Sequence, residues 1–223
     1  MPISVERFVQ LHPVVYHMAE ADSWPSIQAH GLRSTEALLD LFGIAGRKRE
    51  KLLSEHRPEM VPISHDEYGT AWIRDQKPMS DGALARVLQD GLTPRDWYEK
   101  LNRNTFFWAT KTRLNKFTNA KPYRDITHCV LTVDSESLLD AHLDRTTLSH
   151  YNSGSTKPNP FPRGNDCFLP FDEFPFDRWR RSYSQKNIVA EVVVDYSVPD
   201  IQNHTVNVDL VRGSEVIENI YRR

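Results

Sequence analysis

The spacing of apolar residues predicts short helices alternating with strands early in the chain, and strands clustered near its end. Apolar positions recur every three or four residues where helices are expected and crowd into short runs where strands are expected. We expect helices over residues 4–11, 22–30, 34–42, 47–55, 81–89, 93–102, 111–118 and 135–142. We expect strands over 14–16, 105–109, 127–133, 187–194 and 205–211, and a helix-like segment ending at residue 223. This order predicts an α+β fold with a mixed or mainly antiparallel sheet and short flanking helices.

Several predicted helices begin or end at residues suited to capping. Thr93 is followed by Pro94 and an acidic first turn, which is typical of a helix start. Asp22 is expected to cap the helix that carries Trp24 on its buried face. Gly31 is placed to end that helix in the left-handed conformation. These signals set the expected boundaries of the helices.

Two segments show no clear periodicity in the spacing of their hydrophobic residues. Residues 57–80 contain prolines and a glycine, so loops and short strands are expected there. Within them, Trp72 and Ile73 are expected to be buried anchors that place Arg74 at a defined position. Residues 149–176 form a long loop rich in Pro, Gly, Ser and Asn, and a loop of this length is usually functional or mobile. Its many aromatic residues predict that it packs on the rest of the protein.

The composition is that of a soluble protein with one sizeable core. With 223 residues and a formal net charge of -2, the chain is expected to form a single domain over 1–223. Its apolar runs are too short to span a bilayer, and the N-terminal stretch lacks a signal-peptide pattern. Cys129 and Cys167 imply no disulfide framework. We therefore expect a cytoplasmic protein without membrane association, in which both cysteines are small buried side chains.

Charge and motif content narrow the classes of function. Near-neutral charge argues against a surface coated with phosphate contacts, while the basic segments 47–49, 111–121 and 178–181 are either solvated surface or local nucleic-acid patches. The nine histidines follow no HExxH, HxH or cysteine-paired pattern, so no metal site is predicted. The common nucleotide-binding loops, GxGxxG and GxxxxGKS/T, are missing. NSGST, residues 152–156, reads as a turn.

A few side chains are candidates for chemistry. Glu191 has only apolar neighbours in NIVAEVVV, so it is either an edge-strand glutamate facing water or a carboxylate at the floor of a cleft. Arg74 is either a phosphate clamp or a surface ion pair with Asp75, and Arg113 is a similar case. His17, at the end of a predicted strand, is either a ligand-binding residue or an ordinary core histidine.

Three stretches together resemble the ADP-ribosyltransferase fold, and most closely the DarT-type toxins and their uncharacterised relatives. YHMAEADSWPSIQAHGL resembles the opening motif of that family, a Tyr-His on the first strand followed by a helix that ends in Gly-Leu. TFFWATKTRL resembles its aromatic strand and short helix. IVAEVVVDYSVPDI resembles its final motif, in which a catalytic glutamate precedes a Val-Pro turn. The resemblance implies a split sheet, and the loop 149–176 has no counterpart in it.

The resemblance also implies an NAD site and roles for individual residues. Glu191 is implied as the catalytic carboxylate, and Arg74 as the arginine upstream of the aromatic strand, which together with Arg113 is a candidate for the pyrophosphate. His17 is implied to hydrogen-bond the adenosine ribose, and the backbone of Met18 to hold the nicotinamide amide, although many family members have Gly or Thr there. The residues expected to contact NAD are Tyr16, His17, Met18, Phe107, Trp108, Arg113 and Tyr123.

The implied function is an NAD-dependent ADP-ribosyltransferase that uses NAD as co-substrate and no metal. It would cleave the nicotinamide–ribose bond and transfer ADP-ribose to a macromolecule, with DNA or RNA favoured over protein. A toxin or phage-defence effector with a matching antitoxin fits this resemblance. The alternatives are a non-catalytic module that binds NAD or ADP-ribose, and a tRNA 2′-phosphotransferase-like enzyme.

Overall fold

A seven-stranded sheet forms the centre of the computed structural model, which describes residues 1–157 and 160–223. The strand order is β11-β10-β6-β1-β5-β8-β7, and every pairing between these strands is antiparallel. The strands are β1 (Val14–Glu20), β5 (Asn104–Trp108), β6 (Thr127–Asp134), β7 (Thr146–Ser149), β8 (Glu191–Asp195), β10 (Thr205–Arg212) and β11 (Glu215–Arg222). The predicted α+β class is confirmed, and its sheet is antiparallel rather than mixed.

This sheet is divided between β1 and β5. β1 pairs with β6 along its whole length, from Val14 opposite Asp134 to Glu20 opposite His128. With β5 it shares one register pair, Tyr16 opposite Trp108. Beyond that pair the two strands separate, so the sheet consists of a β11-β10-β6-β1 half and a β5-β8-β7 half that meet at one point.

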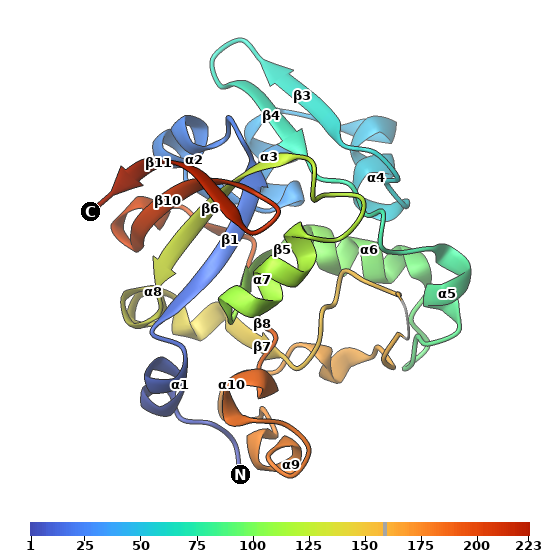
Figure 1. Ribbon diagram of the computed structural model, residues 1–223. Helices are drawn as coiled ribbons and strands as arrows, with labels where there is room; N and C mark the ends of the chain where they lie inside the picture. The colour runs from blue at the N-terminus through green and yellow to red at the C-terminus, as the bar shows by residue number, and fades with distance from the viewer. Residues whose placement is uncertain (158–159) are drawn as a thin grey trace.

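Helices lie around the sheet on both sides (Figure 1). The α-helices are α1 (Val5–Leu11), α2 (Trp24–His30), α3 (Thr35–Leu41), α4 (Gly46–Ser54), α5 (Asp81–Ala85), α6 (Pro94–Arg103), α7 (Lys111–Thr118), α8 (Ser135–His142), α9 (Phe176–Trp179) and α10 (Gln185–Ile188). Single 3₁₀ turns are η1 (Leu143–Arg145), η2 (Asn165–Cys167) and η3 (Ile201–Asn203). In the part of the chain that the structure describes, no helix is both long and apolar enough to cross a membrane.

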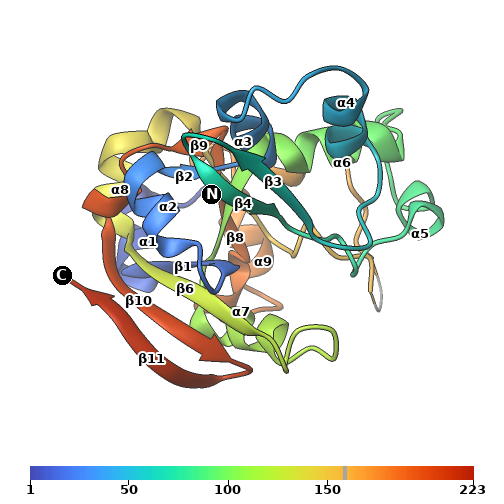
Figure 2. The same ribbon diagram turned by 90° about the horizontal axis from the view of Figure 1, so that it is seen from above.

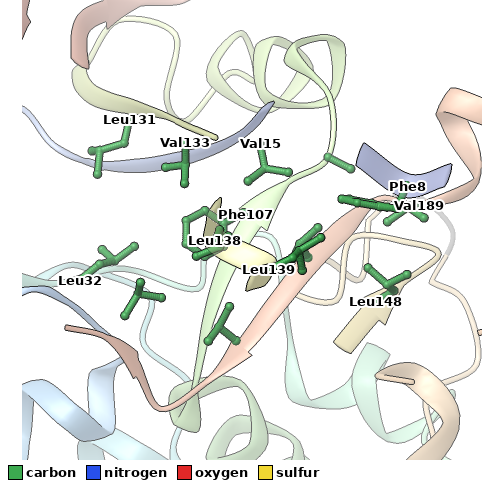
Figure 3. Packing of buried hydrophobic residues seen from close by; sticks show 14 of the residues in the cluster. Phe8, Val15, Leu32, Phe107, Leu131, Val133, Leu138, Leu139, Leu148 and Val189 are labelled. Carbon is green, nitrogen blue, oxygen red and sulfur yellow. The ribbon is translucent and has the colours of Figure 1, made fainter. Parts of the chain in front are cut away.

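The main core lies against one face of the sheet. Val15, Leu131 and Phe107 come from β1, β6 and β5, and they pack with Leu138 and Leu139 of α8. Figure 3 shows these side chains gathered around Phe107. The core fixes the positions of both halves of the sheet and therefore the width of the gap between them.

Two small two-stranded sheets cover the gap. β2 (Leu32–Arg33) pairs with β9 (Ser197–Val198), and β3 (Val61–His65) pairs with β4 (Gly69–Ile73) in a hairpin. In Figure 2 this hairpin crosses the upper side of the molecule. The hairpin lies in the aperiodic segment where short strands were expected.

The turn before β2 depends on Gly31. This residue ends α2 as predicted, with φ 80° and ψ 166°, which is a region reserved for glycine but not the left-handed helical region expected. A Cβ there would lie 2.6 Å from the Cα of Pro199. The glycine therefore allows the backbone of α2 to approach the segment after β9.

Several predicted boundaries need correction. Ser23, not Asp22, is the N-cap of α2, and its side chain makes no capping hydrogen bond. The helix expected over 81–89 ends at Ala85. The strand expected over 187–194 begins only at Glu191, because the preceding residues form the helical turn α10. The final helix-like segment is strand β11, and β7 had not been predicted.

The predictions for the cysteines and for the helix that begins at Thr93 are confirmed. Cys129 and Cys167 are free and buried. Thr93 caps α6 in a reciprocal capping box with Asp96. Ser34 caps α3 through a hydrogen bond from the Ala37 N–H.

Candidate functional site

A cavity of about 320 Å³ opens where β1 and β5 separate. Its size lies within the range usual for small-molecule sites, about 300–1,000 Å³. Its walls come from both halves of the sheet, from α2 and α3, from β4 and from the turn at 152–154. The predicted site residues that line it are His17, Met18, Arg74, Phe107, Trp108, Tyr123 and Glu191.

Glu191 is the first residue of β8, a strand flanked on both sides by other strands. It lies opposite Trp108 of β5 and Ser149 of β7, and its side chain is buried. The interpretation of Glu191 as an edge-strand residue facing water is therefore wrong. Both carboxylate oxygens accept the backbone N–H of Ser153, at 3.1 and 3.3 Å. Ser153 lies in the NSGST segment, which forms the predicted turn and brings this donor to the carboxylate.

Burial raises the pKa of Glu191 to about 7. The Ser153 N–H and the guanidinium groups of Arg113 and Arg163 act in the opposite direction and stabilise the carboxylate. The group thus changes between acid and carboxylate near neutral pH. A buried carboxyl group with such a pKa in a cavity is a typical feature of a catalytic site.

Arg163 anchors the long loop that supplies Ser153. Its buried guanidinium donates to the carbonyls of Asn152, at 3.4 Å, and of Ser155. It also lies over the rings of Trp97 and Tyr151, at 5.8 and 5.6 Å from their centroids. The loop therefore packs on the protein, as its aromatic residues predicted.

His17 is held as a neutral ring whose other nitrogen has no hydrogen-bond partner among the described residues. Its Nδ1 is 2.8 Å from the carbonyl oxygen of Phe106. Because a carbonyl only accepts, Nδ1 carries the proton and Nε2 carries the lone pair. Burial lowers the pKa of His17 to about 4, so the ring stays neutral at physiological pH. Since His17 lines the cavity, this acceptor suits a ligand hydroxyl.

Arg74 extends into the cavity over two aromatic rings. Its guanidinium carbon lies 5.3 Å from the Tyr123 ring centroid and 5.8 Å from that of Phe117. One Nη donates to Glu20 at 3.2 Å. Arg74 therefore forms an ion pair, as the alternative interpretation expected, but with Glu20 rather than Asp75, which instead accepts the O–H of Tyr123 at 2.6 Å.

Donor capacity remains on Arg74. Its Nε is buried and has no hydrogen-bond partner among the residues that the structure describes. The Arg74 side chain is 27% exposed, and its Nη2 makes no hydrogen bond to the described residues. This Nη2, rather than the inaccessible Nε, is the donor that remains for an anionic oxygen, such as that of a phosphate.

Arg57 supports the backbone of Arg74 and is itself bonded to Asn102, and no pattern in the sequence indicates either residue. Arg57 donates from Nε to the carbonyl of Arg74 at 3.2 Å and from Nη2 to the side chain of Asn102 at 2.8 Å. Burial lowers the pKa of Arg57 to about 10, so it remains charged. Arg57 lies in the aperiodic segment, where only the fold reveals its role.

Two predicted residues do not line the cavity. Tyr16 packs beside Leu114 and Val130 on the far side of the Tyr16–Trp108 pair. Arg113 donates to the carbonyl of Asn187 at 2.7 Å and acts on Glu191 only through its charge. Both were assigned from their place in a motif, which does not fix the direction of a side chain.

Trp72 was predicted to be a buried anchor, and this prediction is wrong. Ile73 is buried, but Trp72 is 38% exposed and lines the cavity. Strand alternation explains the difference, because neighbouring residues of β4 face opposite sides.

One group of potential metal ligands lies outside the cavity in the described part of the chain: His142, Asp200 and His204. Asp200 accepts from both rings, at 2.7 and 3.2 Å. Arg145 donates to Nδ1 of His142 at 2.9 Å, so the proton of that ring is on Nε2, which faces Asp200. In this arrangement the group is a hydrogen-bond network that ties α8 to η3.

A comparison with curated proteins found no match. The chain matches DUF7002, described as a family of unknown function, over residues 13–205. This stretch contains every residue that lines the cavity and ends at the start of β10. The chain therefore belongs to the DUF7002 family.

Proposed function

We propose that this protein is an NAD-dependent ADP-ribosyltransferase of the ADP-ribosyltransferase fold. The observation that carries the proposal is the buried Glu191, with a pKa near 7, in a cavity that divides an antiparallel sheet. His17, with its acceptor nitrogen, and Arg74, with its guanidinium group, line the same cavity. The binding of a dinucleotide requires a hydrogen-bond acceptor for a ribose hydroxyl and a hydrogen-bond donor for a phosphate. Its cleavage requires a carboxylate.

In the proposed reaction, NAD supplies a glycosidic bond with a good leaving group. That bond breaks with its electron pair leaving on nicotinamide, and positive charge develops on the ribose, as in glycoside cleavage. The carboxylate of Glu191 stabilises this charge and accepts a hydrogen bond from the ribose 2′-hydroxyl. An acceptor nucleophile then bonds to the ribose C1′, and Glu191 is placed to receive its proton.

The remaining residues bind and orient. His17 accepts a hydrogen bond from the adenosine ribose through Nε2, and Arg74 contacts the pyrophosphate. Trp108 and Phe117, whose rings lie 5.7 Å apart, form an apolar wall that limits the access of water to the reacting bond.

We favour a nucleic-acid acceptor over a protein. Lys111 and Lys116 are exposed on α7, the helix that also supplies Phe117 to the cavity. Arg180 and Arg181 are exposed as well. Basic side chains of this kind can contact the phosphates of a polynucleotide. A toxin or defence role with an antitoxin partner is part of the same proposal.

The test is transfer of label from NAD. Wild-type protein, Glu191→Gln and the exposed control Glu218→Gln are incubated with labelled NAD and either single-stranded DNA, RNA or protein from a lysate. We expect nicotinamide release and labelled nucleic acid with the wild type and the control, and a loss of at least 100-fold with Glu191→Gln.

Binding of NAD by the wild type without release of nicotinamide would overturn the enzymatic proposal. That outcome would favour a non-catalytic NAD-binding module. Transfer of a 2′-phosphate from an RNA substrate to NAD would instead indicate the tRNA 2′-phosphotransferase-like alternative.

A further inference from the structure

Trp72 is an exposed indole at the cavity. Large apolar side chains that are exposed in the described residues are Met1, Trp72, Leu143, Phe161, Tyr183, Val216 and Ile217. Of these, Trp72 lines the cavity. An indole left in water forgoes the free energy of burial, so a cavity that contains one favours a ligand that covers its face.

The hairpin fixes the direction of this indole. Ala71 and Ile73 of β4 pack with Leu38 and Leu39 of α3 in a separate apolar cluster. Because side chains alternate along a strand, Trp72 faces away from that cluster. Arg74 follows directly after the end of β4, and both Trp72 and Arg74 line the cavity.

Contacts along the cavity wall put these groups in an order. Glu191 lies opposite Trp108 in the β5–β8 register. The Trp108 ring lies 5.7 Å from Phe117, and the Arg74 guanidinium lies over Phe117. Trp72 lies near the end of β4, and Arg74 is the first residue after that strand. The order is carboxylate, guanidinium, indole.

We propose that Trp72 is the stacking surface for the adenine ring of NAD. This inference rests on the proposed function. The order of groups on the wall matches the order in the dinucleotide, which runs from the reacting ribose through the pyrophosphate to the purine. Stacking of a base on an aromatic side chain contributes binding affinity without hydrogen bonds to the edge of the base. Trp72 would then set the affinity for NAD without touching the reacting atoms.

The test measures binding of parts of the dinucleotide to the full chain. Wild type, Trp72→Ala, Trp72→Phe and the control Tyr183→Ala, an exposed aromatic away from the cavity, are titrated with NAD, AMP and nicotinamide mononucleotide. We expect Trp72→Ala to weaken binding of NAD and AMP roughly 5- to 100-fold and to leave nicotinamide mononucleotide unchanged. Trp72→Phe should stay within about threefold of wild type, because it keeps an aromatic face.

The outcomes separate the two proposals. Wild type that binds NAD and releases nicotinamide, with unchanged NAD and AMP affinity in Trp72→Ala, would refute the adenine site and leave the proposed activity standing. If Trp72→Ala instead raises only the KM for a nucleic-acid acceptor, the indole belongs to an acceptor base and the adenine assignment is wrong. Wild type that binds no NAD would overturn both.

Discussion

At the scale of single residues, the position of Glu191 conflicts with the stability of the fold. Its carboxyl group is buried between two strands, and among the residues that the structure describes only the N–H of Ser153 donates a hydrogen bond to its oxygens. A buried carboxylate with so few donors is costly to ionise. Retaining it is expected only where the charge serves a purpose, because sites that bind or react are often built at the expense of stability.

The first prediction concerns stability and pH. The pKa of Glu191 in the folded protein, about 7, lies above its ordinary value of 4.5, so between these pH values the folded state binds more protons than the unfolded state. The contribution of Glu191 to the free energy of unfolding therefore falls as pH rises from 4.5 to 7 and is constant above. Glu191→Gln removes this loss and should stabilise the protein at pH 8 by roughly 3 kcal/mol.

Urea unfolding of wild type and Glu191→Gln at pH 4 and pH 8 checks this expectation. The advantage of the variant should disappear at pH 4, where the wild-type carboxyl group is protonated in both states. Equal stability of the two proteins at pH 8 would show that the carboxylate is better compensated than its surroundings indicate.

At the scale of elements, local signals decided which predictions succeeded. The sequence predicted α7 and α8 with their correct ends, because Thr110 and Asp134 cap them through backbone N–H groups. The last segment was read as a helix because its apolar residues are spaced as in one. It is a strand because it follows Gly213, with φ 58°, in a two-residue turn that pairs it with β10.

The second prediction concerns the turn at Gly31. Gly31→Ala should destabilise the protein by about 3 kcal/mol or more, because the new methyl group would collide with the backbone of Pro199 in addition to the unfavourable φ. Gly43→Ala is a matched control, with φ 60° and no atom within 4 Å of the added Cβ, and should cost only about 1 kcal/mol. Thermal unfolding of both variants measures the difference, and equal losses would contradict a close approach at Gly31.

At the scale of the whole molecule, the cavity depends on pairings that no local pattern reveals. The sequence indicated that His17 and Glu191 were of interest, but not that β1, which carries His17, separates after one pair from β5, the strand that pairs with Glu191. The support of Arg74 by Arg57 and the exposure of Trp72 also follow from tertiary contacts. Such features cannot be predicted from local sequence patterns, because they depend on contacts between residues that lie far apart in the chain.

The third prediction concerns ligand and global stability. If NAD binds the cavity, NAD at about 100 times its Kd should stabilise the fold by about 2.7 kcal/mol. For a chain of this size that corresponds to a rise in Tm of roughly 5–10 °C. Differential scanning fluorimetry with NAD, and with Arg74→Ala as the variant expected to lose the rise, checks this. An unchanged Tm of the wild type in millimolar NAD would contradict the proposed site.

The single pairing of Tyr16 with Trp108 has a mechanical consequence. Because the two half-sheets share one register pair, the packed core, rather than a run of backbone hydrogen bonds, holds the gap between them. His17 belongs to one half of the sheet and Glu191 to the other. A ligand that contacts both residues would add a second link between the half-sheets. Its binding would therefore make the protein more rigid around the cavity, and its release would reverse this.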